Sequence, residues 1–445
     1  MATRPTPSNE TSQARLGSAE RETLLTQMWQ LFSEKVVDGL RKRTGYNVRQ
    51  RQATARRLLL TVVEAFLLGE TLAFAPLRAI FVRRFGQIEK CPFHSRFKQA
   101  QAAEFFRQAL HLAVMCIVNP PDLALSGPLR CFHDVLLYDA TSQRLPPRGR
   151  AKMPSCAQAK AGAKTVVGYS IKPGRIDDAV CDAQKSADLP LWRSLVPTFV
   201  RDVLYMFDLG FFDLKMFTSA RMDGAHVLMR LKSKVKVKVL GAMVHDKLVP
   251  LPGWSLSYYL QSASKKRGTL YDLDVVLGGG CNKVHMRLVG YAKASNQVRW
   301  YVTTVTRQML TSREVVEAYR LRWHIELLFR EIKQSSDLGR SFTADPNAVK
   351  ALTYGALLGH VLARSIRIQA AISKQVPLSE LRPLACLRTI KPYAQDIIDA
   401  LTHSACSVFE QIVGIVSHTL IANARERAPS RSRPRIALEL GAIGA

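Results

Sequence analysis

The sequence lacks the features of a membrane-spanning or secreted protein. Its longest apolar runs, at 58–68 and 351–362, contain Glu64 and His360 and are shorter than the roughly 20 residues that a spanning helix needs. Residues 1–21 are polar and have no apolar centre, so we expect no secretory signal. The eight cysteines are scattered without a C-x-x-C pair, which is typical of free thiols in a reducing compartment. We therefore expect a cytoplasmic location and no membrane partner.

Acidic residues are also scarce. Only 35 Asp and Glu stand against 64 Lys and Arg, which leaves a formal net charge of +29. Such an excess favours a polyanionic partner, and the missing membrane signals leave nucleic acid as the expected one. With 445 residues, 47% of them hydrophobic, the chain can fold into about three domains at ~150 residues each.

The residue pattern divides the chain into successive segments. A polar leader at 1–20 precedes a helical stretch at 21–125, whose clustered basic residues predict DNA contact. Short strands follow in 130–222, and helices return in 306–372. Between them, 223–305 shows alternating strands and turns, which predicts an inserted all-β unit. The last segment, 373–445, starts helical and ends in a basic Arg/Ser/Pro tail.

One strand of the predicted β unit carries a lysine at every second position. These lysines are Lys232, Lys234, Lys236 and Lys238. Strand alternation would place all four on one face. That face is either an edge protected from aggregation by charge or a surface that follows DNA phosphates, and the pattern alone leaves both open.

Two predicted strands end by delivering an aspartate. The run HDVLLYDATS (133–142) ends near Asp139, and the run RDVLYMFDLG (201–210) ends near Asp208. Asp134 and Asp202 stand at the beginnings of the same strands, so they are expected at the opposite end of the sheet.

A strong helix is predicted over Ser312–Ser335, with Thr311 or Ser312 as its cap. Tyr319, Arg322, Glu326 and Lys333 follow one another at spacings of three, four and seven, so they share one face, with Arg330 beside them. Considered alone, this pattern also fits an ordinary surface helix in which Glu326 pairs with Arg322 and Arg330.

The segment YRLRWHIELLFREIK resembles the Y-(2)-R-(3)-E-(6)-K signature of bacterial insertion-sequence DDE transposases, the insertion-sequence-four family. LLYDATS and MFDLGFFDLKMF resemble the segments that carry the two aspartates of that family. The resemblance implies that Asp139, Asp208 and Glu326 form the catalytic, metal-binding triad. It also implies an α/β ribonuclease-H-like core (130–222 and 306–372) with an all-β insertion, flanked by an N-terminal helical domain and a C-terminal helical tail.

Phosphodiester cleavage explains why three carboxylates are needed. Two Mg²⁺ ions, ~3.5–4 Å apart, can activate the attacking oxygen and stabilise the leaving one. Mg²⁺ prefers hard oxygen ligands and keeps several waters, so two or three carboxylates suffice to hold the ions. Mn²⁺ accepts similar ligands and is expected to substitute.

Cations and aromatic residues near Glu326 are expected to contact DNA. By resemblance, Tyr319, Arg322 and Lys333 contact the phosphates of the transposon end, with Arg330 nearby. Trp300 matches a position where some relatives stack a flipped base, and Trp323 adjoins Arg322. For both tryptophans an ordinary role in packing is an open alternative.

The expected function is transposition by a cut-and-paste route. The protein would bind the terminal inverted repeats of its element as double-stranded DNA, cleave them, and join the 3′ ends to target DNA as a homodimer. The resemblance implies a bacterial, nucleoid-associated protein. A catalytically silent, domesticated DNA-binding regulator is one alternative, and a metal-dependent nuclease without strand transfer is another.

Overall fold

The computed structural model describes residues 18–425 except 50, 117–124, 126, 157–159, 173, 264–265, 281, 295–296, 337 and 404. Most of the polar leader and nearly all of the Arg/Ser/Pro tail lie outside the described residues. No helix in this described part is long and apolar enough to cross a lipid bilayer.

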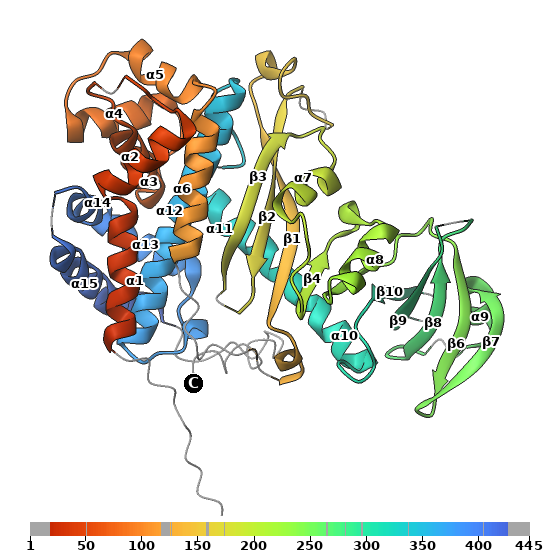
Figure 1. Ribbon diagram of the computed structural model, residues 1–445. Coiled ribbons are helices and arrows are strands. Elements are labelled where there is room, and N and C mark those ends of the chain that lie inside the picture. Colours follow the sequence, from red (N-terminus) through yellow and green to blue (C-terminus); the bar gives the residue numbers. More distant parts are fainter. Residues whose placement is uncertain are drawn as a thin grey trace, which may run out of the picture.

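A mixed β-sheet runs through the described part of the molecule (Figure 1). Its ten strands lie in the order β3-β2-β1-β4-β5-β10-β9-β8-β6-β7. β1 is antiparallel to β2, and β2 to β3, whereas β1, β4 and β5 run parallel. The strands of this half are β1 (Asp134–Arg144), β2 (Gly162–Ser170), β3 (Arg175–Ala183), β4 (Val203–Phe207) and β5 (His226–Arg230).

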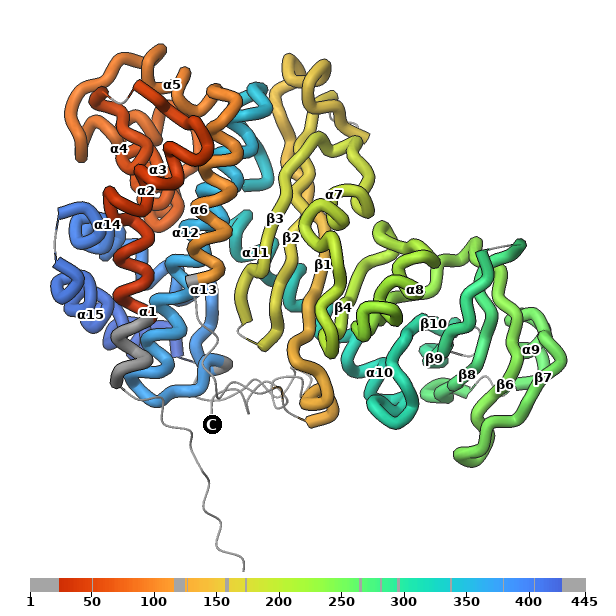
Figure 2. Tube along the Cα trace, viewed as in Figure 1, coloured from red at the N-terminus to blue at the C-terminus, as the bar shows by residue number. Residues whose placement is uncertain are grey.

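The second half of the sheet is antiparallel and begins where β10 pairs with β5. Its strands are β6 (Val237–Val244), β7 (Lys247–Ser255), β8 (Leu270–Leu277), β9 (Val284–Ala294) and β10 (Gln297–Thr303). The segment 223–305 therefore continues the sheet of the preceding strands. It is also not all-β, because it contains the short helix α9 (Leu256–Ser262). Figure 2 shows this half on the side away from the N-terminal helices.

The lysine-rich stretch does not form one alternating strand. β5 ends at Arg230 and β6 begins at Val237, so Lys232, Lys234 and Lys236 lie in the connection and only Lys238 is in a strand. The four lysines are nevertheless all exposed. The alternating lysines predict one continuous strand, but a turn at 233–235 separates β5 from β6.

Strand alternation divides the apolar residues between the two faces of the sheet. Val135 and Leu137 of β1 join a large cluster with the N- and C-terminal helices, whereas Leu136 and Tyr138 join a second cluster on the opposite face. The second cluster is covered by α7 (Asp188–Leu195) and α8 (Leu214–Met222). Each face of the sheet therefore has its own core.

The helices on the first face come from both ends of the chain (Figure 1). The N-terminal set comprises α1 (Ser18–Leu31), α2 (Glu34–Thr44), α3 (Ala55–Leu67), α4 (Phe74–Phe85), α5 (Lys90–Lys98) and α6 (Ala102–Cys116). The C-terminal set comprises α12 (Pro346–Ser373), α13 (Pro383–Ile390), α14 (Ala394–His403) and α15 (Cys406–Ala424).

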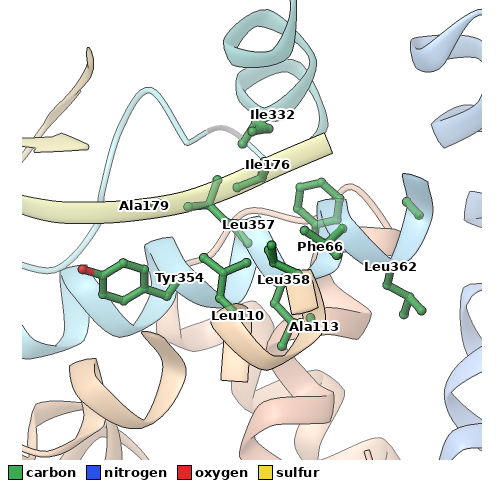
Figure 3. Packing of buried hydrophobic residues seen from close by; sticks show 14 of the residues in the cluster. Phe66, Leu110, Ala113, Ile176, Ala179, Ile332, Tyr354, Leu357, Leu358 and Leu362 are labelled. Carbon is green, nitrogen blue, oxygen red and sulfur yellow. The ribbon is translucent and has the colours of Figure 1, made fainter. Parts of the chain in front are cut away.

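α12 is the central element of this helical layer. Pro346 occupies its first turn and Asp345 caps it by accepting from the backbone N–H of Ala348. Figure 3 shows α12 residues such as Leu357 between Leu110 of α6 and Ile176 of β3. Because α12 contacts α3, α6, α15 and β3, the N-terminal helices share one core with the C-terminal helices and the sheet.

Candidate active site

Strand geometry places Asp139 and Asp208 side by side. In β1, Val135 and Leu137 face the helical layer, and Asp139 is the next residue on that face. In β4, Leu204 and Met206 face the same way, and Asp208 follows. β1 and β4 are parallel, with Tyr138 opposite Phe207 as their last pair, so both carboxylates lie where the β1–β4 pairing ends. The predicted strand end near Asp139 is wrong, because β1 continues to Arg144 in its pairing with β2.

Glu326 arrives from a helix that packs against β1. The polypeptide first forms α10 (Ser312–Ala318), which begins with a capping box between Thr311 and Glu314. A 3-10 turn, η4 (Tyr319–Arg322), follows, and then α11 (Trp323–Ser336) carries Glu326 in its first turn. The predicted single helix over Ser312–Ser335 is therefore wrong, since it is two helices joined by a tighter turn.

Tyr319 has a different position from the one expected. Its side chain is buried, and its hydroxyl donates a hydrogen bond to the carbonyl oxygen of Phe207 at 3.1 Å. This bond fastens η4 to the last residue of β4, directly before Asp208. The proton that we expected Tyr319 to give to a DNA phosphate is thus already donated to the backbone, and Tyr319 positions the turn that carries Arg322.

The three carboxylates line one cleft of about 520 Å³. Nine residues were predicted to be catalytic or to contact DNA. Six of them line this cleft: Asp139, Asp208, Arg322, Glu326, Arg330 and Lys333. Tyr319, Trp300 and Trp323 do not. The lining also includes residues that the sequence did not single out: Ala140, Thr141, Ser142, Phe329 and Gln334. The polar run directly after Asp139, at Thr141 and Ser142, was the available signal for part of this second group.

Arg322 joins two of the carboxylates. Its Nη1 donates to Oδ2 of Asp139 at 2.8 Å, and its Nη2 is ion-paired with Oε1 of Glu326. The Arg322 and Asp139 side chains are each only 17% exposed, so the pair is shielded from solvent. The pairing of Arg322 with Glu326, considered above as an ordinary helix contact, is present. It belongs to a wider bridge that reaches across to β1.

Electrostatics in the cleft follow from this crowding. Burial raises the pKa of Asp139 to about 6, with further raising by the negative charges of Asp208 and Glu326, although Arg322 and the backbone N–H of Ala140 lower it. Burial also lowers the pKa of Lys333. The positive charge of Arg322 therefore favours the charged form of Asp139, against burial and the neighbouring carboxylates.

Other carboxylates in the same stretches of sequence have structural partners elsewhere. Asp134, at the start of β1, accepts hydrogen bonds from Ser170 and from the backbone N–H of Lys172. Asp213 caps α8. Glu331 is buried beside His360 of α12, away from the cleft.

The two tryptophans differ sharply in surroundings. Trp300 of β10 lies across Gly290 of β9, where a Cβ atom would come within 2.5 Å of the indole, and its ring is 5.5 Å from that of Tyr271. It belongs to the core on the face of the sheet opposite Asp139. Trp323, the first residue of α11, is 57% exposed. Neither lines the cleft, but only Trp323 presents an open ring beside Arg322.

The donor set suits a hard divalent cation, because Asp139, Asp208 and Glu326 offer only carboxylate oxygens. In the part of the chain that the structure describes, no group of three or more His, Cys, Asp or Glu side chains is arranged to bind a metal ion. The guanidinium of Arg322 contacts both Asp139 and Glu326 instead.

Comparison with known proteins gives the class of the molecule. Residues 130–362, more than half of the chain, match the family described as "Transposase DDE domain". The protein therefore belongs to the DDE transposase family, whose members generally use divalent metal ions. The matched region contains all three carboxylates of the cleft.

Other comparisons are more distant. No curated protein matches the chain. A solved structure, the "piggyBac transposase synaptic complex with hairpin DNA", is similar with a TM-score of 0.49 at 10% identity, covering 95% of this chain and 90% of that one.

Proposed function

We propose that this protein is a cut-and-paste transposase of the insertion-sequence-four kind. It would bind the ends of its own element, cleave phosphodiester bonds with divalent metal ions and join the 3′ ends to target DNA. The observation that carries the proposal is the cleft itself, in which Asp139, Asp208 and Glu326 meet from β1, the end of β4 and α11. Membership of the DDE transposase family supports it.

The strand order supports a ribonuclease-H-like core. An antiparallel β1-β2-β3 group followed by parallel β4 and β5, with helices on both faces, is the arrangement that the proposal needs. In the proposed division, residues 130–222 and 306–372 form the catalytic core and 223–305 the insertion, except that β5, at 226–230, belongs with the core because it pairs in parallel with β4. Residues 21–125 bind DNA, and 373–445 form a C-terminal helical region.

Asp139, Asp208 and Glu326 would hold two Mg²⁺ ions, or Mn²⁺ in their place. Bound there, such ions supply Lewis-acid stabilisation to the attacking and leaving oxygens of the phosphodiester. The role of the chain is to hold oxygen ligands from β1, from the end of β4 and from α11 in one cleft. The hydrogen bond from Tyr319 to Phe207 keeps the turn before Glu326 next to Asp208.

The cations of α11 and η4 would position the DNA. Arg330 is exposed and Lys333 half-buried on the cleft wall, so both can reach a phosphate there. Arg322 would offer a planar fork to a phosphate once it leaves its carboxylates. Both ends of the element must be cut together, so a homodimer on DNA is part of the proposal.

The test is incubation of the full-length protein with Mg²⁺ and duplex DNA carrying the ends that flank its coding sequence. Cleaved ends and joined products are expected from the unaltered protein. Asp139→Asn, Asp208→Asn and Glu326→Gln should each reduce cleavage by ~10²-fold or more, while end binding in a gel-shift assay changes little. Asp202→Asn is the matched control. Asp202 lies directly before β4 and Asp208 directly after it, so the two aspartates are at opposite ends of the same strand, and this variant should still cleave.

The alternative functions give other products. A nuclease without strand transfer would yield cut ends and no joined DNA. A silent DNA-binding regulator would shift the end fragment in the gel and leave it intact at every Mg²⁺ concentration. Cleavage that survives all three substitutions would overturn the assignment of the cleft as the active site.

A further inference from the structure

The side chain of Arg322 lies where two of the proposed metal ligands converge. It donates from Nη1 to Asp139 at 2.8 Å and pairs through Nη2 with Glu326, so one guanidinium spans β1 and α11. The cleft holds two other cations, Arg330 and Lys333, but neither is ion-paired with a carboxylate within the described residues.

Three carboxylates in a half-buried cleft repel one another unless a cation lies among them. In this structure Arg322 supplies that positive charge. A guanidinium and a divalent cation need the same resource, the oxygen lone pairs of Asp139 and Glu326, and they also repel each other. The two cannot be fully bound to these oxygens at the same time.

A DNA phosphate offers Arg322 an alternative partner. Arg binds phosphate in the same forked geometry that it uses for carboxylates, so the exchange costs it little directional bonding. η4 and the first turn of α11 keep the Arg322 side chain at the cleft while it exchanges one anion for the other.

We propose that Arg322 is the internal counter-ion of this cleft and that it exchanges partners when DNA binds. In the DNA-free protein it holds Asp139 and Glu326 together. When a phosphate takes the guanidinium, the two carboxylates become available to divalent cations. The inference rests on the proposed function, since it takes Asp139, Asp208 and Glu326 as the metal ligands.

Linkage gives the consequence. If DNA frees the carboxylates, DNA raises metal affinity, and metal must raise DNA affinity by the same factor. The DNA-free protein then binds metal ions weakly. The carboxylates become free to bind the ions that cleavage needs only when a DNA phosphate has taken Arg322. This assigns Arg322 a positioning role for the carboxylates in addition to its expected contact with the DNA end.

The experiment is a Mn²⁺ titration of full-length protein without DNA, followed by the electron paramagnetic resonance signal of free Mn²⁺. Arg322→Gln should bind Mn²⁺ ~5–150-fold more tightly than the unaltered protein, the usual range of a coupling between two sites. Arg330→Gln removes the same charge from the same cleft without breaking an ion pair, so its affinity should change much less. Adding duplex DNA with an already cleaved end should tighten Mn²⁺ binding to the unaltered protein and hardly affect Arg322→Gln.

Thermal unfolding is the second readout. Without metal, Arg322→Gln leaves Asp139 and Glu326 without their counter-ion and should melt at a lower temperature than the unaltered protein. Mn²⁺ should raise its melting temperature by more than it raises that of the unaltered protein, because at one Mn²⁺ concentration the protein that binds the ion more tightly is stabilised more.

Two outcomes overturn the inference in distinguishable ways. Equal tightening in Arg322→Gln and Arg330→Gln, or no tightening in either, would mean that the bridge does not compete with metal, and the proposed function would stand. If Mn²⁺ binding is insensitive to Asp139→Asn in every protein, with and without DNA, the cleft is not a metal site and the proposed function fails as well.

Discussion

Gly359 of α12 lies directly against the ring of Phe66 on α3. A Cβ atom at position 359 would come within 2.7 Å of Phe66 Cγ, and one at Gly355 would come within 2.4 Å of Val62 Cγ1. Two glycines one turn apart therefore let α3 and α12 approach closely, and this contact joins the N-terminal helices to the layer that supports α11.

Gly359→Ala should therefore destabilise the protein. The added methyl group must displace an aromatic ring in a fully packed core, and such overpacking typically costs ~1–3 kcal/mol. Gly414→Ala is the matched control, because Gly414 lies within α15 with open space around it. It should gain up to ~1 kcal/mol from helix propensity. Urea denaturation of both variants measures the difference, and a stabilised Gly359→Ala would show that the helices have room to separate.

A buried ion pair connects the second half of the sheet to the segment that leads to the cleft. Arg287 of β9 and Asp272 of β8 are 6% and 7% exposed and pair at 2.6 Å. Arg287 Nη1 also donates to the carbonyl oxygens of Val305, Thr306 and Leu310, and Ser312 at the start of α10 donates to Asp272. The pair thus clamps the loop before α10.

Arg287→Met should cost ~3–5 kcal/mol, because it leaves buried Asp272 with the more exposed Arg307 as its cation and leaves buried carbonyl groups without donors. The control is Arg193→Met. Arg193 pairs with Asp213 at the same 2.6 Å, but its side chain is 53% exposed, so the loss should not exceed ~1 kcal/mol. Equal losses in urea denaturation would contradict the role assigned to burial.

Local sequence patterns were sufficient to place Asp139 and Asp208 on one face of neighbouring strands, whereas Glu326 was added to them by the family resemblance. These patterns did not show that β1 continues past Asp139 to Arg144. They were insufficient for Tyr319, since a helical residue pattern continues unbroken through the 3-10 turn and nothing local marks the hydrogen bond to Phe207. The meeting of β5 with β10 is likewise a long-range pairing.

The sequence did not show which basic side chains are free to contact DNA and which bind other parts of the protein. Arg56 belongs to the helical stretch 21–125, whose clustered basic residues predict DNA contact. In the structure its guanidinium donates to the carbonyl oxygens of Phe32 at 2.6 Å and Leu401 at 2.7 Å. A sequence reports the positive charge of Arg56 but not a carbonyl group 345 residues away.

Acid should weaken the fold through His360. Burial lowers its pKa below the usual 6.5, against the opposing effect of Glu331 and with further lowering by Arg364 and Arg367. A histidine whose pKa is lower in the folded state binds protons more readily when unfolded, so its contribution to stability is present above pH 6.5 and is lost as the pH falls below it.

The free energy of unfolding should therefore be lower at pH 5.5 than at pH 7.5, and His360→Gln should reduce that difference. Gln can keep a hydrogen bond to Glu331 but does not titrate. His403→Gln, at the exposed end of α14, is the control and should leave the difference unchanged. The assignment fails if His360→Gln shows the same pH dependence as the unaltered protein in urea denaturation.

The two tryptophans allow stacking on DNA to be separated from packing. Trp323 is exposed beside Arg322, so Trp323→Ala should leave stability unchanged and weaken binding of the DNA end by ~1–3 kcal/mol, the usual value of one stacked base. Trp300 fills the space over Gly290 against Tyr271, so Trp300→Ala should lower the free energy of unfolding by ~2–4 kcal/mol through the cavity it leaves. Both variants are measured by urea denaturation and by fluorescence anisotropy on labelled end DNA. If Trp300→Ala unfolds like the unaltered protein yet loses end binding, Trp300 is the residue that stacks a base, and the packing role assigned to it is wrong.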